Sequence, residues 1–360
     1  MLSGSRLGSK REKIEIDLAL ENFLAEACSR LGSIDPHLAP ISTALTEFLV
    51  GGKRLRPLFA IAGYVGAGGS VGKGQMNAIY KAASSLELLQ ACALIHDDMM
   101  DGSDTRRGAP SIHRRFENEH KNRSGVGNSE SFGSAAALLL GDLALVLSTQ
   151  ALNTSGITVE QLAAVNPIFD TMKVELMAGQ YLDMHAGSRS EVSVDDALKI
   201  AIYKSGKYTI ERPLHFGGSL ALCTPELLTL YSDYGIPLGI AFQLRDDLLG
   251  VFGDSALTGK PAGDDLLEGK RTALISYALS HMNSDDSSEF LKLFGNRNSA
   301  STQIQRMREL INTSGAVQFI EKIIDEKTTL ALHASADSRI TSSGQELLAE
   351  LALAATQRSA

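Results

Sequence analysis

The 360-residue sequence contains no tryptophan and only three cysteines. Cys28, Cys92 and Cys223 are far apart in the sequence, form no CxxC pair and lie in apolar stretches. This spacing excludes a dense disulfide framework, and it argues against a zinc site because paired cysteines or histidines are typical of one. We expect three reduced cysteines that pack as small core residues, and therefore a reducing compartment.

Long apolar runs are also missing. No stretch of about 18 residues is free of charged or helix-breaking residues. The first residues are basic, but the uninterrupted apolar core of a signal peptide does not follow them. We therefore expect a cytoplasmic protein with no integral membrane segment.

The formal net charge is −8. A nucleic-acid-binding protein of this charge would need a strong basic stripe to overcome the overall field, and no such stripe with interleaved aromatic residues is present. The basic residues occur instead in short clusters, which suits a compact anion better than a polymer. The charge pattern thus predicts no nucleic-acid partner.

Helical periodicity dominates the sequence. Apolar residues recur at three- and four-residue spacing over residues 14–31, 76–100 and 138–152, which is the pattern of an amphipathic helix. No tandem repeat and no clear linker divides the chain. We predict an all-α protein with a single domain over residues 13–360, preceded by a disordered leader over residues 1–12.

Two glycine-containing stretches are predicted to lie outside helices. Residues 118–134 are polar and glycine-rich, so we expect a long loop there. Residues 66–74, GAGGSVGKG, have the composition of a phosphate-binding loop, but Ala67 and Gly74 stand where that motif requires glycine and serine or threonine. We interpret this second stretch as a turn between two helices.

A cluster of carboxylates ends one of the predicted helices. The stretch LIHDDMMDGSDTRRG, residues 94–108, contains Asp97, Asp98 and Asp101 in the last helical turn, and Asp104 follows. Like charges at four-residue spacing repel each other, and the C-terminal end of a helix is itself negative. We therefore expect a positive group beside these carboxylates that the helix itself does not supply.

A second cluster has the same character. The stretch FQLRDDLLGVFGD, residues 242–254, places Asp246 and Asp247 among apolar residues of another predicted helix. Such carboxylates are expected to face an internal cavity. Because no His or Cys ligand accompanies them, they predict Mg²⁺, which takes one or two carboxylates and completes its coordination with water and substrate phosphate.

Short basic motifs indicate the same phosphate, although any one of them alone would be a solvated surface charge. The basic residues concerned are Lys53, Arg54, Arg56, Arg106, Arg107, Lys204, Lys207, Lys260, Lys270 and Arg271. A di-metal carboxylate bundle would instead require two ExxH motifs. Only one candidate, Glu117 to His120, is present, so we set that interpretation aside.

Motifs spread over most of the chain closely resemble those of the trans-isoprenyl diphosphate synthase (polyprenyl synthetase) family. In chain order they are GGKRLRP at 51, LIHDDMMDGSDTRRGAPSIH at 94, LLLGD at 138, GQYLDM at 179, KSGKYT at 204, FQLRDD at 242 and GDDLLEGKRT at 263. The resemblance implies an all-helical homodimer whose helices surround a central cavity, with the two aspartate motifs facing each other. It also implies head-to-tail trans condensation of isopentenyl diphosphate with an allylic diphosphate.

The resemblance implies a role for each matching residue. The catalytic set is Asp97, Asp98, Asp101, Lys204, Asp246 and Asp247. Asp97, Asp101 and Asp246 correspond to ligands of three Mg²⁺ ions that are bound with the diphosphate. The residues implied to contact the allylic diphosphate are Arg106, Lys204, Lys260 and Lys270. Those implied to hold isopentenyl diphosphate are Lys53, Arg56, Gln90 and Arg107. Ser205, in place of a common threonine, and Gln243 are implied to flank the allylic group.

One position departs from the family pattern. The second aspartate motif usually reads DDxxD, but here it reads DDLLG, with Gly250 in the third position. The metal role of this cluster then depends on Asp246 and Asp247, or on Asp254 one turn further along. Whether Asp254 compensates is left open at this point.

Product length follows from the helix that leads to the first cluster. In the family this helix lines the tunnel for the growing chain, and here Cys92 and Ala93 precede Asp97 where aromatic residues would stop growth at C15. Leu88 and Leu89 lie about 5.4 Å deeper, which predicts geranylgeranyl diphosphate, C20. A farnesyl or longer polyprenyl diphosphate synthase remains an alternative, as does a regulatory or scaffold subunit of a heteromeric synthase. A terpene cyclase of the same fold would have no use for the second diphosphate site.

Overall fold

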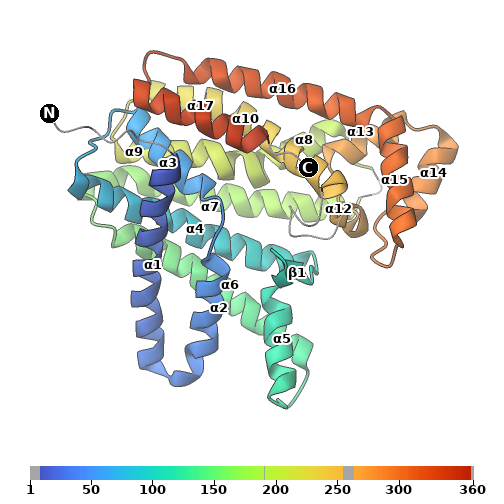
Figure 1. Cartoon of the computed structure of the whole chain (residues 1–360), viewed down its shortest axis with the longest axis horizontal. Coiled ribbons are helices and arrows are strands. Elements are labelled where there is room, and N and C mark those ends of the chain that lie inside the picture. The colour runs from blue at the N-terminus through green and yellow to red at the C-terminus, as the bar shows by residue number, and fades with distance from the viewer. Residues whose placement is uncertain (1–8, 190, 254–262, 358–360) are drawn as a thin grey trace. The chain divides into compact units, whose positions relative to one another are not determined.

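The computed structural model describes residues 9–189, 191–253 and 263–357 (Figure 1). They form two compact units: the first lies within Met1–Phe169, Pro213–Leu228 and Ser338–Leu351, and the second lies within Asp170–Arg212, Thr229–Asp337 and Ala352–Ala360. Among these described residues, the only strands are two short ones of two residues each, which pair in a single hairpin. The predicted all-α fold is confirmed.

The first unit contains the N-terminal helices. Its elements are α1 (Ser9–Ile34), η1 (Pro36–Leu38), α2 (Ala39–Leu49), α3 (Leu55–Gly66), α4 (Lys73–Met100), β1 (Thr105–Arg106), β2 (Ala109–Pro110), α5 (Ile112–Asn122) and α6 (Ser129–Asn153), with most of α9 (Arg212–Leu220). Besides α9, three helices contribute residues to both units, namely α7 (Val159–Gly187), α10 (Pro225–Phe252) and α17 (Ser342–Thr356). The second unit contains α8 (Val194–Ala201), the π-helix η2 (Ile202–Glu211), α12 (Asp264–Glu268), α13 (Ala273–His281), α14 (Ser284–Leu293), α15 (Ser301–Thr313) and α16 (Ala316–Ser335).

The core of the first unit is built around α4 and α6. Leu88, Cys92 and Ile95 of α4 are buried in one cluster with Leu140 of α6. Gly141 lets these two helices approach closely, because a Cβ atom at this position would lie 2.1 Å from the His96 ring. Both helices are long and apolar enough to cross a membrane, but 72% of the α4 window and 50% of the α6 window are buried inside the protein. They are core helices of a folded unit.

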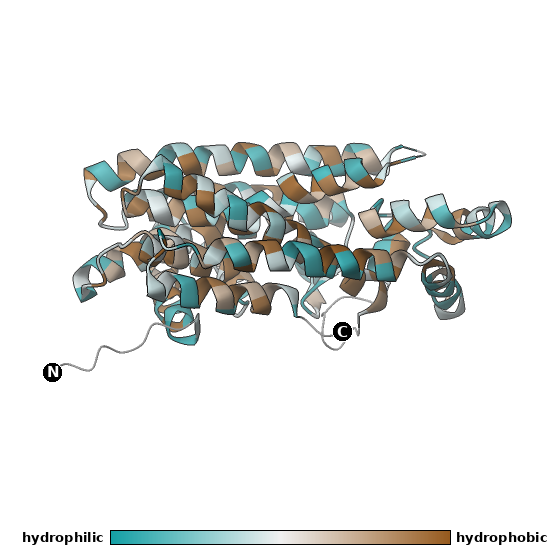
Figure 2. Cartoon of the chain, turned by 90° about the horizontal axis from the view of Figure 1, so that it is seen from above, coloured by the Kyte–Doolittle hydropathy of each residue, from teal (hydrophilic) through white to brown (hydrophobic). Residues whose placement is uncertain are grey.

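The core of the second unit is built around α10. Leu244, Leu248 and Val251 of α10 are buried with residues of α13, α15 and α16. Arg245 also ties α10 to its neighbours, because its guanidinium donates two hydrogen bonds of 2.7 Å to Glu321 of α16 and one of 2.9 Å to the Thr356 carbonyl. Hydrophobic and hydrophilic residues alternate along the helices (Figure 2), as expected where one face packs and the other meets water.

Two predicted non-helical stretches are corrected by the structure. Residues 9–12, predicted to end a disordered leader, belong to α1, where buried Glu12 accepts a hydrogen bond from Tyr80. The predicted loop over 118–134 is mostly helical, since α5 ends at Asn122 and α6 begins at Ser129. The Asn128 side chain accepts a hydrogen bond of 2.8 Å from the Ser131 amide and caps α6. The interpretation of residues 66–74 as a turn is confirmed, because α3 ends at Gly66 and α4 begins at Lys73.

Candidate active site

The first carboxylate cluster lies where it was predicted, at the C-terminal end of α4. Asp97 and Asp98 belong to the last turn, and Asp101 caps the helix with its amide on the Asp97 and Met99 carbonyls. Asp98 is buried, whereas the side chain of Asp97 keeps 17% of its exposure and Asp101 is half-buried. The three carboxylates therefore differ in environment although they adjoin in sequence.

Arg106 neutralises the buried member of this cluster. Its Nε donates to Asp98 Oδ2 at 2.7 Å and its Nη2 donates to Asp98 Oδ1 at 2.5 Å, while Asp97 Oδ2 is 3.8 Å from the same Nη2. Burial alone would lower the pKa of Arg106, but Asp98, Asp97 and Asp101 together raise it. Asp97 and Asp101 are therefore the members of the cluster best placed to bind a further cation.

A hairpin directs the two adjacent arginines to different partners. In β1 and β2, Arg106 pairs with Ala109, so the turn consists of Arg107 and Gly108 alone. Both turn residues have positive φ, +53° and +76°, as a type I′ turn requires. Arg106 reaches Asp98, whereas Arg107 donates from Nη1 to the Phe48 carbonyl at the end of α2, at 3.3 Å.

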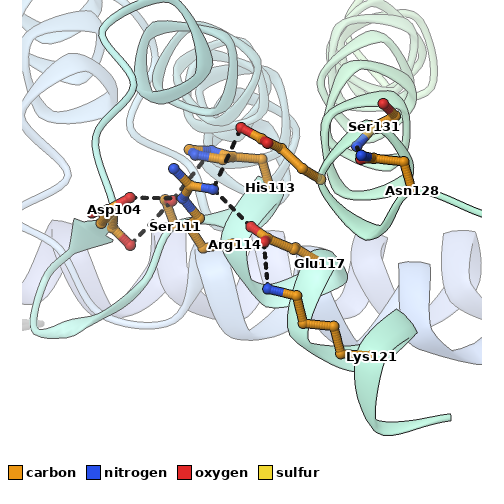
Figure 3. A network of polar contacts seen from close by, with 9 residues as sticks. Asp104, Ser111, His113, Arg114, Glu117, Lys121, Asn128 and Ser131 are labelled. Atoms are coloured by element: carbon orange, nitrogen blue, oxygen red, sulfur yellow. Dashed lines mark hydrogen bonds and ion pairs between the residues drawn. The ribbon is translucent and has the colours of Figure 1, made fainter. Parts of the chain in front are cut away.

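Asp104 anchors this hairpin to α5 instead of joining the cluster. Its carboxylate accepts a 2.7 Å hydrogen bond from Arg114, and the Ser111 amide donates to its backbone carbonyl at 2.9 Å. Arg114 also contacts Glu117, which in turn accepts from Lys121 (Figure 3). Hydrogen bonds from Lys121 and Arg114 lower the pKa of Glu117 to about 2. Glu117 is therefore engaged in ion pairs with Arg114 and Lys121.

The basic GGKRLRP segment forms the turn between α2 and α3. Gly51, Gly52 and Arg54 all have positive φ, a conformation that glycine adopts without strain and arginine does not. The predicted phosphate ligand Lys53 is exposed, and Arg56 is half-buried in the first turn of α3. Gln90 is half-buried on α4, seven residues before Asp97. The predicted ligands of the first unit therefore lie in the turn before α3, on α3 and α4, and in the hairpin.

The second carboxylate cluster lies on α10 in the second unit. Asp247 is buried, and its Oδ1 accepts a 2.7 Å hydrogen bond from Gln243, a residue predicted to flank the allylic group. Burial raises the pKa of Asp247 well above its usual value, and the charges of Asp265, Asp246 and Asp183 act in the same direction. Four carboxylates from α7, α10 and α12 therefore gather in this unit.

Two lysines that were predicted to contact the allylic diphosphate lie beside carboxylates of this second cluster. Lys204, on η2, donates to Asp183 Oδ2 at 2.6 Å. Gly179 of α7 makes this approach possible, since a Cβ atom there would lie 2.5 Å from the Lys204 backbone nitrogen. Lys270 lies 2.9 Å from Glu268 and 3.9 Å from Asp265. Ser205 is half-buried on η2, and Lys260 and Asp254 lie outside the described residues.

The position of Gly250 has a steric explanation. A Cβ atom at this residue would lie 2.0 Å from Oδ2 of Asp265, so the carboxylate of Asp265 occupies the space that a side chain in the third motif position would need. Sequence reasoning missed both Asp265 and Asp183 as neighbours of Asp247. Each stands within a motif quoted above, GDDLLEGKRT or GQYLDM, but nothing in their spacing along the chain links them to α10.

Within the described residues, no three His, Cys, Asp or Glu side chains are grouped closely enough to hold a metal ion by themselves. This does not conflict with Mg²⁺, which is usually held by one or two carboxylates together with water and substrate phosphate. Oxygen donors without a His or Cys ligand fit that ion.

Comparison with known proteins agrees with this geometry. The family model described as polyprenyl synthetase matches residues 39–311. A curated geranylgeranyl diphosphate synthase of Saccharolobus solfataricus is 28% identical over 88% of this chain and 86% of its own length. A geranylfarnesyl diphosphate synthase of Aeropyrum pernix is 31% identical over 85% of this chain and 87% of its own length.

A solved structure is more similar still. It is a geranylgeranyl pyrophosphate synthase from Corynebacterium glutamicum, complexed with isoprenyl diphosphate and magnesium, with a TM-score of 0.93 and 39% identity over 98% of this chain and 99% of that chain. The chain belongs to the polyprenyl synthetase family.

Proposed function

We propose that this protein is a Mg²⁺-dependent prenyl diphosphate synthase that makes geranylgeranyl diphosphate, C20. It condenses isopentenyl diphosphate head-to-tail with an allylic diphosphate and forms a trans double bond. The observation that carries the proposal is the composition of α4, which ends in Asp97, Asp98 and Asp101 and has small residues one turn earlier. The similar Corynebacterium glutamicum structure contains isoprenyl diphosphate and magnesium, which supports the substrate class and the ion.

Asp97 and Asp101 in the first unit, and Asp246 in the second, are the proposed Mg²⁺ ligands. The donor set supports this choice, because Asp98 is already neutralised by Arg106 whereas Asp97 and Asp101 remain partly exposed. When bound, Mg²⁺ acts as a Lewis acid that stabilises charge on the pyrophosphate leaving group. Among the described residues, the fixed cations Arg106, Lys204 and Lys270 are the proposed contacts of the allylic diphosphate.

The reaction needs no protein nucleophile. The allylic C1–O bond breaks and its electron pair leaves with pyrophosphate, and the alkene of isopentenyl diphosphate supplies the electrons for the new carbon–carbon bond. Loss of a proton from C2 of the isopentenyl unit to the departing pyrophosphate completes the product. The chain's part is to fix both diphosphates with cations and to keep water from the allylic cation. Lys53, Arg56, Gln90 and Arg107 are the proposed ligands of isopentenyl diphosphate.

The proposed product length rests on residues of α4. Cys92 is buried and Ala93 is half-buried, and neither side chain would block a growing chain. Leu88 and Leu89, one turn deeper, are fully buried and are the proposed floor. Curated relatives differ in product, geranylgeranyl in one case and geranylfarnesyl in another, so family membership leaves chain length to experiment.

The test is to incubate the purified protein with Mg²⁺, isopentenyl diphosphate and each of the C5, C10 and C15 allylic starters, and to size the products by mass spectrometry. A dominant C20 product is expected. C15 or a longer product would overturn the chain length, and no condensation with any starter would favour a regulatory or partner-dependent subunit.

Replacing Ala93 tests the tunnel directly. Ala93→Phe should shorten the product from C20 to C15, because an aromatic ring there would fill the space before Leu89. Lys81→Ala is a control on the same helix, since Lys81 is exposed and is no part of the proposed tunnel. An unchanged product spectrum in Ala93→Phe would show that α4 does not limit chain growth.

We also propose that the protein is a homodimer. Leu138, Leu139 and Val146 of α6 are 49%, 65% and 65% exposed, and their spacing puts them near one face of the helix. An exposed apolar face of this kind is typical of a protein interface. Light scattering should give twice the chain mass, and Leu139→Glu with Val146→Glu should give a monomer; a monomeric wild-type protein would contradict the proposal.

A further inference from the structure

Arg54 lies between two proposed phosphate ligands in sequence, Lys53 and Arg56, but its own side chain is buried. Only 5% of the residue is exposed. Its three nitrogens reach three different helices: Nε donates to Asp17 of α1 at 2.7 Å, Nη1 to Glu87 of α4 at 2.7 Å, and Nη2 to the Leu49 carbonyl of α2 at 2.6 Å. Arg54 thus ties the turn before α3 to α1, α2 and α4.

The backbone at this turn is strained as well as tied. Arg54 has φ +52° and precedes the first residue of α3, so it sets where that helix begins. A non-glycine residue in this conformation is strained, and it persists only where its surroundings hold it. The three side-chain hydrogen bonds of Arg54 stabilise the residue in this backbone conformation. They thereby fix the backbone positions of its neighbours Lys53 and Arg56.

The same contacts extend to Arg107. Arg54 and Arg107 bind successive carbonyls, those of Leu49 and Phe48, at the C-terminal end of α2, where the helix dipole favours cations. A Cβ atom on Gly52 would lie 3.6 Å from Nη1 of Arg54 and 3.6 Å from Nη2 of Arg107, so both guanidinium groups lie beside this turn. Burial lowers the pKa of Arg107, and the charge of Glu87 acts in the opposite direction.

Glu87 is the buried anion of this arrangement. It is 4% exposed, its Oε2 accepts from Arg54, and its Oε1 has no hydrogen-bond partner among the residues that the structure describes. A buried carboxylate with one satisfied oxygen is expensive, and a hydrophobic pair would serve packing alone equally well. Its position beside two cations of the turn and the hairpin indicates a role in setting their geometry.

We propose that Arg54 and Glu87 are positioning residues that hold Lys53, Arg56 and Arg107 in the geometry that binds the diphosphate of isopentenyl diphosphate. The inference rests on the proposed function. Neither residue touches the substrate; both act through the turn before α3 and the end of α2. Loss of either should weaken binding of isopentenyl diphosphate and leave binding of the allylic diphosphate unchanged.

The test compares four variants of the full-length protein, namely Arg54→Lys, Arg54→Gln, Glu87→Gln and the double variant Arg54→Gln with Glu87→Gln. Arg54→Lys keeps the charge but loses the planar fork that reaches three acceptors. Glu87→Gln keeps the shape, and Arg54→Gln with Glu87→Gln removes both buried charges. Each should raise the KM for isopentenyl diphosphate, and its calorimetric Kd, about 10- to 100-fold. The KM for farnesyl diphosphate should change less than twofold. In the double variant, stability should recover relative to Arg54→Gln alone, but affinity should not.

Tyr80→Phe is the matched control. Tyr80 of α4 donates to buried Glu12 of α1, so this variant leaves a buried carboxylate without its donor between the same two helices, away from the turn. It should lower stability and leave both KM values unchanged. If the variants at 54 and 87 keep wild-type affinity, or lose affinity for both substrates equally, the inference is wrong. A wild-type protein that binds no isopentenyl diphosphate would overturn the proposed function with it.

Discussion

The two carboxylate clusters carry the same Asp-Asp pair in opposite electrostatic settings. In the first, both carboxylate oxygens of buried Asp98 accept hydrogen bonds from the guanidinium of Arg106, which the adjacent hairpin supplies. In the second, buried Asp247 accepts a hydrogen bond only from the amide of Gln243 among the described residues, and the charges of three further carboxylates raise its pKa. The first buried carboxylate is compensated by a cation of its own unit, whereas no cation among the described residues pairs with the second.

This difference shows how much each cluster depends on an added cation. In the first cluster, Arg106 compensates the member that cannot reach water, so that unit tolerates its carboxylates without a bound ion. In the second, Lys204 and Lys270 pair with Asp183 and with Glu268, not with Asp247. The second cluster is thus under greater electrostatic strain in the metal-free protein.

The largest expected effect is on stability and should have opposite sign in the two clusters. Asp98→Asn should lower the free energy of unfolding by about 3 kcal/mol, because it leaves the buried charge of Arg106 without its main partner. Asp247→Asn should raise it, because it removes a buried carboxyl group whose ionisation is disfavoured by burial and by three neighbouring carboxylates. The measurement is urea unfolding in EDTA. A loss of stability in both variants would show that Asp247 is compensated after all.

The next effect is on catalysis. Asp97→Asn should lower kcat about 10²- to 10³-fold, as expected when a group that stabilises transition-state charge is removed. Asp246→Asn should lower kcat by a smaller factor, because Asp247, Asp183 and Asp265 are further carboxylates of the same cluster. Asp170→Asn is the control and should leave kcat unchanged, because Asp170 is an exposed residue of α7 that pairs with Lys173. An equal or larger loss in Asp246→Asn would reverse the ranking of the two clusters.

The first cluster was largely predictable from sequence, and the second only in part. Apolar periodicity is a local signal, so it placed Asp97, Asp98 and Asp101 at the end of a helix that does end there. The turn that separates Arg106 from Arg107 depends on positive φ at an arginine, which sequence alone did not indicate.

Long-range neighbours could not be read from spacing. Asp183 lies on α7 and Asp265 on α12, and only the folded unit brings them near Asp247. The wrong loop over 118–134 has a different cause, because glycine and polar composition outweighed the local capping residue Asn128. Arg54 was counted among the phosphate-seeking cations, although its partners on α1, α2 and α4 bury it.

The smallest expected effect concerns Gly250. Restoring the usual family motif with Gly250→Asp should harm the protein, since even a Cβ atom there would lie 2.0 Å from Oδ2 of Asp265. Asp265 would have to rotate away, and the new carboxylate would add a further negative charge to four others. We expect a loss of about 1–3 kcal/mol in unfolding free energy, measured in urea, with lower activity.

Two further variants separate crowding from charge. Gly250→Ala introduces the Cβ atom alone, so it should lose less stability than Gly250→Asp. Gly250→Asp combined with Asp265→Ala transfers the carboxylate from α12 to α10 and should recover most of the loss. If Gly250→Asp were instead more stable or more active than the wild type, the carboxylate of Asp265 would not be the reason for glycine at this position, and the second cluster would lack a ligand that the first cluster has.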